Sequence, residues 1–463
     1  MIKIDNDLTP QMLLPACERL WQLATPKIRR IAEQFPHNAP SPVITRSGQY
    51  EAQGWTEWTR GFQYGAALLS FDATDDTSLL EIGRAGTRRD MHSHVTHFGV
   101  HDHGFNNVST YGNMRRLILE GRLPADADQL EYYELALKSS AAVQAARWSR
   151  TADGGGYIYS FNGPHSLFSD TIRSLRVLAL GHQLGAAVLG ENDAPIRMLD
   201  RLVKHARATA DFNVYYGEAR DVYDMRGRVV HESLFNTNDG RYRCPSTQQG
   251  YSPFSTWTRG LAWVVLGYAE QLEFLDALTD DALEPYGGRQ EVEGFMLKAA
   301  QAACDFFIEQ TPADGIPFWD TGAPGLVHLG DYLNQPADPF NEHEPVDSSA
   351  AAIACQGLLR LGRRFQHQGH RGRGDRYWNA GLTTLRTLLS APYLAEDVNH
   401  DGLLLHTIYH RPRGWDYTPP GAKVPHGEAC MWGDYHLLEA ALYVERIARE
   451  QPYYAFHLPL RAT

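Results

Sequence analysis

Apolar residues recur along most of this chain at the three- and four-residue spacing that places them on one face of an α-helix. The strict alternation that is typical of half-buried β-strands is scarce. The spacing predicts an all-α protein with twelve helices, at about residues 10–34, 54–71, 77–90, 105–121, 128–149, 168–187, 194–209, 257–277, 289–310, 347–367, 374–391 and 427–449.

Two of these helices have recognisable start signals. Asp347 and Ser348 precede the run Ala350–Ile353, and their side-chain oxygens can accept the unpaired amide hydrogens of a first helical turn. The segment 166–170, which runs from a serine to an aspartate, precedes Thr171 in the same way. We therefore expect capped N-termini at both places.

Long polar loops rich in glycine, proline and aromatic residues separate some of the helices, at 151–165, 211–256, 312–346 and 392–426. Loops of this length within a compact domain are usually functional, and Asp239-Gly240 predicts a small hairpin in one of them. No low-complexity linker divides the chain. Twelve helices in hairpin order predict an (α/α)6 barrel, a ring of six helical hairpins, formed by one domain over residues 1–463. A two-domain helical protein is the alternative.

Composition narrows the possible partners. The 463 residues include 43 basic and 55 acidic ones, giving a net charge of -12. Such a balance argues against a nucleic-acid partner, and an anionic substrate would need local cations to overcome the general field. Five scattered cysteines without a CxxC pair look like reduced core thiols. We expect no membrane partner and a cytoplasmic protein, or a periplasmic one if a leader segment was removed, because no long apolar run occurs. The oligomeric state stays open.

Two stretches carry candidate chemistry. The first is His101–Phe105, which reads HDHGF, taken together with Asp170 further along the chain. A pair of carboxyl groups is what glycosidic-bond chemistry commonly needs, one to move a proton and another to hold the sugar or the developing charge. The second stretch, 249–263, supplies an amide, a guanidinium and two indoles. Together they suggest a sugar pocket that contains an acid. The plainer interpretation is that Asp170 only caps a helix and that Asp102 is a loop carboxylate.

Four motifs in order give the chain a family resemblance: HDHGF with the later Asp170, QGYSPFSTWTRGLAW from Gln249, VDSSAAAIACQGLL from Val346, and WGDYHLLEAAL from Trp432. They resemble the unsaturated glucuronyl hydrolases, glycoside hydrolase family 88, over a span from about Trp58 to Glu439. The resemblance implies an (α/α)6 barrel that needs no cofactor. It implies a substrate with a C4=C5 double bond, an unsaturated uronate at the non-reducing end of a lyase-generated oligosaccharide. An acid protonates C4 of the enol ether, water adds at C5, and the resulting hemiketal opens and expels the rest of the chain.

The same resemblance assigns roles by position. Asp170 matches the general acid and base, and Asp102 matches its partner, which holds sugar hydroxyls. The remaining pocket residues implied by the resemblance are His101, Trp58, Gln249, Arg259 and Trp263, with Asn213 standing where the family often has a histidine. Arg259 and Trp263 lie at i and i+4 of a predicted helix and so point the same way. This departure from the family's pattern concerns the identity of the substrate more than the type of reaction.

The acid role sets a physical condition. A helix N-terminus near Asp170 favours the ionised carboxylate, whereas a general acid must be protonated. Burial and a nearby ionised Asp102 would each raise the pKa of Asp170. We therefore expect the two carboxyl groups to lie close together in a poorly hydrated pocket.

Other functions compete with this one. The histidines at 92, 94, 97, 101 and 103 invite a metal hypothesis, but no complete ligand signature surrounds them, and we expect no metal. A glycosidase of the same fold that cleaves saturated glucuronides is the main alternative. A non-catalytic carbohydrate-binding protein is a third possibility.

Overall fold

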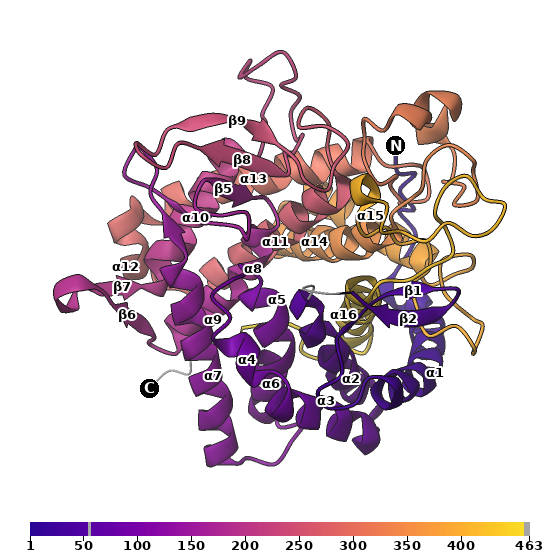
Figure 1. The fold of residues 1–463 in the computed structure, drawn as a ribbon, viewed down its shortest axis with the longest axis horizontal. Helices are drawn as coiled ribbons and strands as arrows, with labels where there is room; N and C mark the ends of the chain where they lie inside the picture. Colours follow the sequence, from indigo (N-terminus) through magenta and orange to yellow (C-terminus); the bar gives the residue numbers. More distant parts are fainter. Residues whose placement is uncertain (54–56, 458–463) are drawn as a thin grey trace.

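The computed structural model describes residues 1–53 and 57–457 and shows helices arranged as a ring (Figure 1). Each of the twelve predicted segments contains helix. Six helical segments are buried on nearly all sides and form an inner ring: α2 (Arg60–Thr74), α5 (His103–Asn107) with α6 (Asn113–Leu119), α8 (Thr171–Ser174) with α9 (Arg176–Gln183), α11 (Thr258–Asp276), α14 (Ser348–His367) and α16 (Met431–Ala448). Six helices with one exposed face surround them: α1 (Pro10–Gln34), α3 (Thr77–Arg89), α7 (Ala127–Ala146), α10 (Met198–Phe212), α13 (Gly288–Glu309) and α15 (Arg371–Leu388).

The inner helices form a closed ring. Going round the ring, α2 packs on α5, α5 on α8, α8 on α11, α11 on α14, α14 on α16, and α16 back on α2. Each outer helix packs against an inner one, as α3 does on α2 and α15 on α14. The predicted (α/α)6 barrel is therefore confirmed. Its apolar core includes residues from Ile2 to Phe456 in one continuous cluster.

Burial explains why the two rings differ in sequence. All residues of α11 from Thr258 to Leu275 are buried, and its apolar residues are spread around the whole helix, as expected for a helix with no solvent face. In α10 the buried residues instead recur at helical spacing along one side, and the opposite side is charged. The hydrophobic pattern of a helix thus indicates whether it lies in the inner or the outer ring.

Short elements fill the loops between the helices. The strands are β1 (Pro42–Arg46), β2 (Gln49–Ala52), β3 (Trp148–Ser149), β4 (Tyr157–Ile158), β5 (Ser166–Phe168), β6 (Ala187–Leu189), β7 (Pro195–Arg197), β8 (Glu232–Phe235) and β9 (Tyr242–Ser246). They pair antiparallel as β1-β2, β3-β4, β6-β7 and β5-β8-β9. The short helices are α4 (His92–Val95), α12 (Asp280–Leu283), η1 (Glu57–Thr59), η3 (Glu191–Asp193), η4 (Glu284–Tyr286), η5 (Pro324–His328), η6 (Tyr332–Asn334) and η7 (Arg411–Arg413). The predicted hairpin is confirmed, since Asp239 and Gly240 lie in the turn between β8 and β9.

Three predicted elements differ in detail. Residues 54–56 of the second predicted helix lie outside the described residues, and α2 begins at Arg60. The helix predicted over 105–121 is interrupted by the π-helix η2 (Val108–Gly112). The capped start predicted for the segment 166–170 is wrong, because its first residues form strand β5 and the Asp170 side chain makes no capping hydrogen bond.

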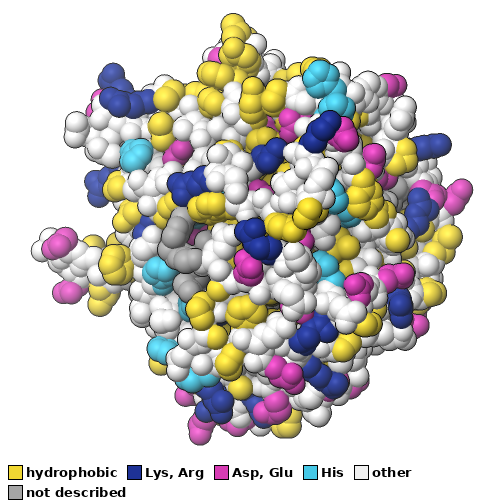
Figure 2. All heavy atoms as spheres, turned by 45° about the vertical axis from the view of Figure 1, so that its right-hand side comes forward, with side chains coloured by type: hydrophobic (Ala, Val, Ile, Leu, Met, Phe, Trp, Pro, Cys, Tyr) yellow, Lys and Arg dark blue, Asp and Glu magenta, His cyan; other side chains and the backbone are white. Residues whose placement is uncertain are grey.

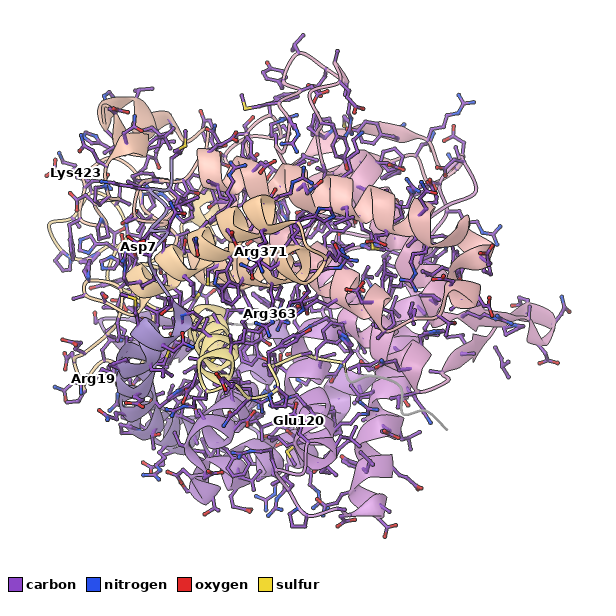
Figure 3. All side chains as sticks on the ribbon, turned by 180° about the vertical axis from the view of Figure 1, so that it is seen from behind. Asp7, Arg19, Glu120, Arg363, Arg371 and Lys423 are labelled. Atoms are coloured by element: carbon purple, nitrogen blue, oxygen red, sulfur yellow. The ribbon has the colours of Figure 1, made fainter. Side chains whose placement is uncertain are left out.

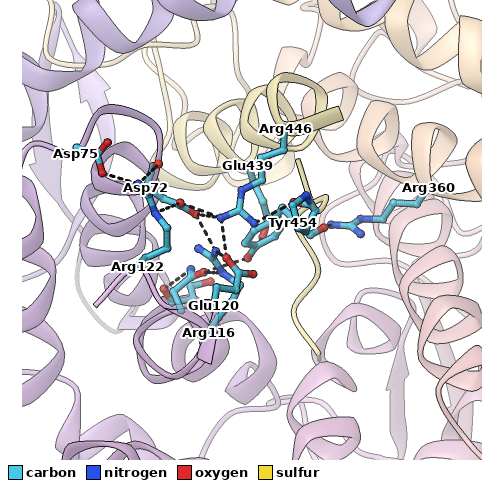
Figure 4. Close-up of polar contacts among 12 residues, drawn as sticks. Asp72, Asp75, Arg116, Glu120, Arg122, Arg360, Glu439, Arg446 and Tyr454 are labelled. Atoms are coloured by element: carbon cyan, nitrogen blue, oxygen red, sulfur yellow. Dashed lines mark hydrogen bonds and ion pairs between the residues drawn. The ribbon is translucent and has the colours of Figure 1, made fainter. Parts of the chain in front are cut away.

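An ion cluster strengthens the seam where α16 meets α2 (Figure 4). The Asp72 carboxylate on α2 lies 2.8 Å from Arg116 of α6 and 2.6 Å from Arg446 of α16. Glu120 lies 2.8 Å from both of these arginines. Because Asp72 and Arg116 are buried, the charges are shielded from salt and link three helices.

The surface carries charges of both signs without a single-sign patch on the face shown in Figure 2. From behind, the labelled Arg19 and Lys423 lie at the edge of the molecule, and the exposed Arg371 lies near the middle of the view (Figure 3). Among the described residues, no helix combines the length and apolar character needed to cross a bilayer.

Two helical glycines test how tightly the inner ring is packed. A Cβ atom on Gly357 of α14 would lie 2.7 Å from the backbone of Leu266 on α11, whereas a Cβ on Gly294 of α13 would meet nothing within 4 Å. We expect Gly357→Ala to lower the free energy of unfolding by about 1–3 kcal/mol, because the ring cannot widen locally. Gly294→Ala should raise it by roughly 0.5–1 kcal/mol through helix propensity. Urea denaturation of both variants checks the prediction, and shifts of the same sign would contradict it.

Candidate active site

A cavity lies at the end of the barrel where the inner helices begin. Its lining includes residues at or next to the starts of α2, α5, α8 and α11, together with residues of the loop that precedes α16. It encloses about 640 Å³ of space, including its open mouth. The predicted site residues that line it are His101, Asp102, Asp170, Trp58, Gln249, Arg259 and Trp263. Because several helix N-termini face this cavity, their dipoles favour an anionic ligand.

The two candidate carboxyl groups meet at one imidazole. The Nε2 atom of His101 lies 3.3 Å from Oδ1 of Asp170 and 3.8 Å from Oδ1 of Asp102. Each aspartate is 8% exposed and His101 is 1% exposed. The aromatic rings of Phe161 and Phe168 pack against the imidazole at 6.0 and 5.5 Å between centroids. The structure thus brings Asp102 and Asp170 together in a poorly hydrated place, as the sequence predicted.

A close backbone contact brings these residues together. A Cβ atom on Gly104 would lie 2.0 Å from the carbonyl oxygen of Ser174, so only glycine allows the HDHGF turn to reach α8. The Ser174 hydroxyl accepts a hydrogen bond from the Gly104 amide at 2.9 Å and donates one to the His101 carbonyl at 2.6 Å. The Gln144 side chain of α7 donates a second bond to that carbonyl at 2.8 Å.

Helix α8 is also held from its inner side. Arg173, three residues after Asp170, lies 2.7 Å from Glu270 of α11 and 2.8 Å from Glu439 of α16. All three side chains are completely buried. Such a buried ion pair fixes the position of its elements, since separating the charges without water is costly.

Burial and mutual charges shift the pKa values of Asp170, Asp102 and His101 in different directions. Burial alone would raise the pKa of Asp170, but the hydrogen bond and charge of His101 outweigh it, so the pKa lies below the usual aspartate value. Burial raises the pKa of Asp102, and the neighbouring Asp170 adds to this rise while His101 opposes it. Burial would lower the pKa of His101, but Asp102 and Asp170 raise it above 6.5. The lowered pKa of Asp170 is the opposite of the rise expected from the sequence, because His101 lies within hydrogen-bonding distance of the carboxylate.

Neither Asp102 nor Asp170 caps the helix that it precedes. Asp170 precedes α8 and Asp102 precedes α5, and neither side chain accepts a capping hydrogen bond. Both carboxylates point into the cavity lining instead. The capping prediction at Asp347 is confirmed, because its Oδ1 accepts the Ser349 amide hydrogen at 3.1 Å.

Arg259 makes more hydrogen bonds to the protein itself than the sequence predicted. Its guanidinium lies 2.9 Å from Asp347 and donates to Oε1 of Gln249 at 2.9 Å. It also donates to the carbonyl oxygens of Ile408 and Tyr409. The residue is 1% exposed. Rather than offering a free fork to a ligand oxyanion, Arg259 fixes the Gln249 amide and the loop that begins at Ile408.

The two predicted tryptophans differ in exposure. Trp58 is half-buried and lies 4.9 Å, between ring centroids, from Trp432. Trp263 is 2% exposed and packs between Phe105 at 4.8 Å and His436 at 5.0 Å. Trp58 therefore offers a ring face to the cavity, whereas Trp263 is chiefly part of the wall behind it.

Asn213 does not line the cavity. It is fully buried at the end of α10, and its side chain donates a hydrogen bond to the Val230 carbonyl at 3.1 Å. The prediction that it contacts the sugar is therefore corrected: its amide is used to join α10 to the following loop.

His231, the residue after Val230, was missed by the sequence reading. Its Nδ1 accepts the amide hydrogens of Gln248 at 3.1 Å and Gln249 at 3.3 Å, which places the ring proton on Nε2. Burial lowers the pKa of His231 to about 4, so the ring is neutral at pH 7. Its Nε2 atom has no hydrogen-bond partner among the described residues, and the negative charge of Asp170 opposes the lowering of its pKa. A lone histidine in a long loop gave no signal that could have identified it.

The histidine run at 92–103 divides between different environments. His103 is buried, with Nδ1 2.8 Å from the Ser140 hydroxyl and Nε2 2.9 Å from the His97 carbonyl. Only His101 of this run lines the cavity. The described residues contain no group of three or more side chains placed to hold a metal ion.

Asp347 offers a test of the Arg259 anchor. Asp347→Ala removes the carboxylate partner of a buried guanidinium and the cap of α14, so we expect it to lower the free energy of unfolding by about 3–5 kcal/mol. Asp347→Asn keeps an acceptor for the cap and should lose less. Urea denaturation checks the order, with the exposed Asp128→Ala as a control expected to shift by no more than about 0.5 kcal/mol. An Asp347→Ala protein as stable as this control would contradict the anchor.

Known proteins resemble this chain in sequence. No family model matches the chain. The unsaturated glucuronyl hydrolase of Bacillus sp. (strain GL1) is 25% identical over 429 residues, covering 90% of this chain and 93% of that protein. An unsaturated chondroitin disaccharide hydrolase of Streptococcus pyogenes serotype M1 is 25% identical over 430 residues, covering 91% and 89%.

A solved structure is similar as well. The crystal structure of the unsaturated glucuronyl hydrolase from Bacillus sp. GL1 superposes with a TM-score of 0.68 at 23% identity, covering 92% of this chain and 97% of that one. The resemblance inferred from the four motifs is therefore confirmed. In sequence this chain resembles the unsaturated glucuronyl hydrolases over nine-tenths of its length, and it shares their fold.

Proposed function

We propose that this protein is a glycosidase that removes a 4,5-unsaturated uronic acid from the non-reducing end of lyase-generated oligosaccharides. The observation that carries the proposal is the pair of buried aspartates that share the His101 imidazole at the floor of a cavity. The activity named for the relatives supports this function over cleavage of saturated glucuronides.

The cavity suits a terminal, negatively charged sugar. It is closed at the aspartates, which are nearly buried, and open at the rim formed by the loop after Ile408. Inner-helix N-termini supply positive potential around the floor, where the uronate carboxylate would have to overcome the net charge of -12. Trp58 offers an apolar ring face, the kind of surface on which a pyranose can stack.

The reaction follows from the chemistry of an enol ether. Asp170 gives a proton to C4, and positive charge develops at C5, where the ring oxygen shares it. Water adds to C5 and returns a proton to the Asp170 carboxylate. The hemiketal at C5 then opens to a ketone, which breaks the bond between C5 and the ring oxygen and leaves a hemiacetal at C1. The hemiacetal collapses to an aldehyde, and this step breaks the glycosidic bond and releases the remaining oligosaccharide. Asp102, whose pKa is raised by burial, accepts or donates hydrogen bonds to sugar hydroxyls.

The proton for this step is held by the His101–Asp170 pair. In the free protein the raised pKa of His101 and the lowered pKa of Asp170 both favour an imidazolium beside a carboxylate. A substrate carboxylate entering the cavity adds negative charge, which raises the pKa of Asp170. The proton then moves from Nε2 of His101 to the carboxyl group of Asp170 as the substrate binds. Asp170 is therefore protonated when the substrate is present.

Asp170→Asn tests the acid. We expect it to slow the loss of the ultraviolet absorbance of the conjugated double bond by about 10²–10⁴-fold on unsaturated disaccharides, because the amide cannot transfer the proton. Its circular dichroism spectrum should be that of the wild-type protein. Full activity in this variant would show that the acid is misassigned. Release of glucuronic acid from a saturated aryl glucuronide would favour the alternative glycosidase.

The pH dependence of kcat/KM tests the shared proton. Since the pKa of His101 is raised above 6.5, the proton should persist beyond the usual histidine range, and kcat/KM should fall as pH rises through that raised value. Asp102 is the strongest influence that raises the pKa of His101. Asp102→Asn should therefore move this alkaline limb to lower pH in whatever activity remains. The exposed Glu342→Gln is the control, and a limb left in place by Asp102→Asn would contradict the assignment.

A further inference from the structure

A buried arginine lies behind the floor of the cavity and has no part in the reaction as described so far. Arg147 directly follows helix α7 and is 5% exposed. It makes no ion pair with the described residues, and its side-chain hydrogen bonds all go to backbone carbonyl oxygens. An unpaired charge away from water is costly, and most buried charges are therefore paired. The position of this cation thus requires an explanation.

The Arg147 guanidinium joins the segment that contains His101 to the segment that packs on its ring. It donates one hydrogen bond to the Phe98 carbonyl, in the loop that leads to His101. On the other side it donates to the carbonyls of Tyr159, at 3.1 Å, and Ser160, at 2.9 Å. The Tyr159 amide donates back to the Arg147 carbonyl at 3.2 Å, and the guanidinium carbon lies 4.2 Å from the centroid of the Tyr159 ring. One side chain therefore fixes the separation of the two segments.

Both segments continue into the lining of the cavity. The first leads to His101 and Asp102, and the second leads directly to Phe161, and all three residues line the cavity. The Phe161 ring is stacked on the imidazole with an angle of 16° between the planes. The hydrogen bonds of Arg147 thus maintain the packing that keeps water away from the imidazole.

The charge of Arg147 acts on the floor as well. Burial raises the pKa of Asp102, and the charges of His101 and Arg147 oppose this rise. Burial lowers the pKa of His101, as Arg147 also does, whereas Asp102 and Asp170 raise it. Burial lowers the pKa of the Arg147 guanidinium, and Tyr159 and Asp102 oppose this effect. The cation therefore favours an ionised Asp102 and a less basic imidazole.

This charge acts unevenly on the His101–Asp170 pair. The main influences on the pKa of Asp170 are burial, His101, His231 and Arg259, and Arg147 is not among them. A cation that lowers the proton affinity of the imidazole more than that of the carboxylate favours movement of the proton from the first to the second. This is the direction that the proposed reaction requires.

No other group near the pair combines a permanent positive charge with the lack of a counter-charge. The further titratable groups that face the pair or Asp102 in the described chain are the half-buried His97, His205, His231 and Arg259. Burial lowers the pKa of His205 to about 3 and that of His231 to about 4, so both are neutral at pH 7. Arg259 is paired with Asp347 at 2.9 Å.

We propose that Arg147 is a positioning residue for the transfer of the proton from His101 to Asp170. The inference rests on the proposed function for the direction in which this proton moves. Arg147 is not among the described residues that line the cavity, so it acts through the residues in front of it. Its hydrogen bonds hold the imidazole between two segments, and its charge makes the imidazole release the proton more readily.

Two variants separate the charge from the hydrogen bonds. Arg147→Gln keeps a donor for the carbonyls but removes the charge, whereas Arg147→Lys keeps the charge with fewer donors. On an unsaturated disaccharide, Arg147→Gln should lower kcat about tenfold and change KM less than about twofold. It should also move the alkaline limb of kcat/KM to higher pH, because the imidazole holds its proton more tightly. Arg147→Lys should leave this limb near its wild-type position and recover part of the rate.

Arg150→Gln is the matched control, because Arg150 lies three residues further along and is exposed. It should change neither kcat nor the alkaline limb. Should circular dichroism show that Arg147→Gln does not fold, Val143→Glu takes its place. The half-buried Val143 lies one helical turn before Arg147, so a carboxylate there offsets the charge and leaves the hydrogen bonds intact, with Val143→Gln as its uncharged control. A limb that stays in place without the charge, or one that moves equally far in Arg147→Lys, would overturn the inference.

Titration of His101 by nuclear magnetic resonance separates this inference from the proposed function, because it needs no turnover. The resonance of the ¹³C-labelled imidazole, assigned with His101→Gln, should titrate at higher pH in Arg147→Gln than in the wild-type and Arg147→Lys proteins. If this shift is observed but no unsaturated disaccharide is turned over, the proposed reaction fails and the action of Arg147 on the imidazole stands. If turnover is observed but His101 titrates at the same pH in all three proteins, the role of Arg147 fails and the reaction stands.

Discussion

The contact between Gly104 and Ser174 is the constraint on which the site depends. The two aspartates come from turns that are distant along the chain, and they face one imidazole only because the HDHGF turn lies against the backbone of α8. A side chain at Gly104 would occupy the space of the Ser174 carbonyl. The barrel supplies the two inner-helix starts, and this backbone contact sets the distance between them.

His101 then determines how the two carboxyl groups behave. Without it, burial would raise the pKa of both aspartates, and each would tend to be neutral. With it, the pKa of Asp170 is lowered and that of His101 is raised, whereas Asp102 keeps a raised pKa. Two identical residue types at the floor of one cavity thus acquire different protonation preferences from their distances to a single nitrogen. The assignment of distinct roles to Asp102 and Asp170 rests on this asymmetry.

The sequence predicted the barrel because the inner and outer helices bury different fractions of their surface, and burial leaves a hydrophobic period that can be read directly. It predicted the meeting of Asp102, Asp170, Gln249 and Arg259 through a family resemblance. It failed where the outcome depended on contacts between distant segments. Asn213 matches a pocket position of the family, but its amide is bonded to the Val230 carbonyl. His231 gives no local signal, because its tautomer is set by backbone amides of the distant 248–249 turn. The role of Arg259 as an anchor depends on carbonyls at 408–409, which no local pattern reveals.

The closure of the inner ring by α16 has a consequence for the growing chain. Glu439 of α16 neutralises Arg173 directly behind the catalytic floor, and Arg446 joins α16 to Asp72 at the seam. During translation α16 emerges after the other eleven helices. A nascent polypeptide that stops before Met431 has a gap between α14 and α2. Arg173 then lacks its partner Glu439, so the helix that follows Asp170 is not yet fixed in position. Synthesis of the closing helix, and not of the segments that contain the two aspartates, is therefore the event that closes the barrel behind the cavity.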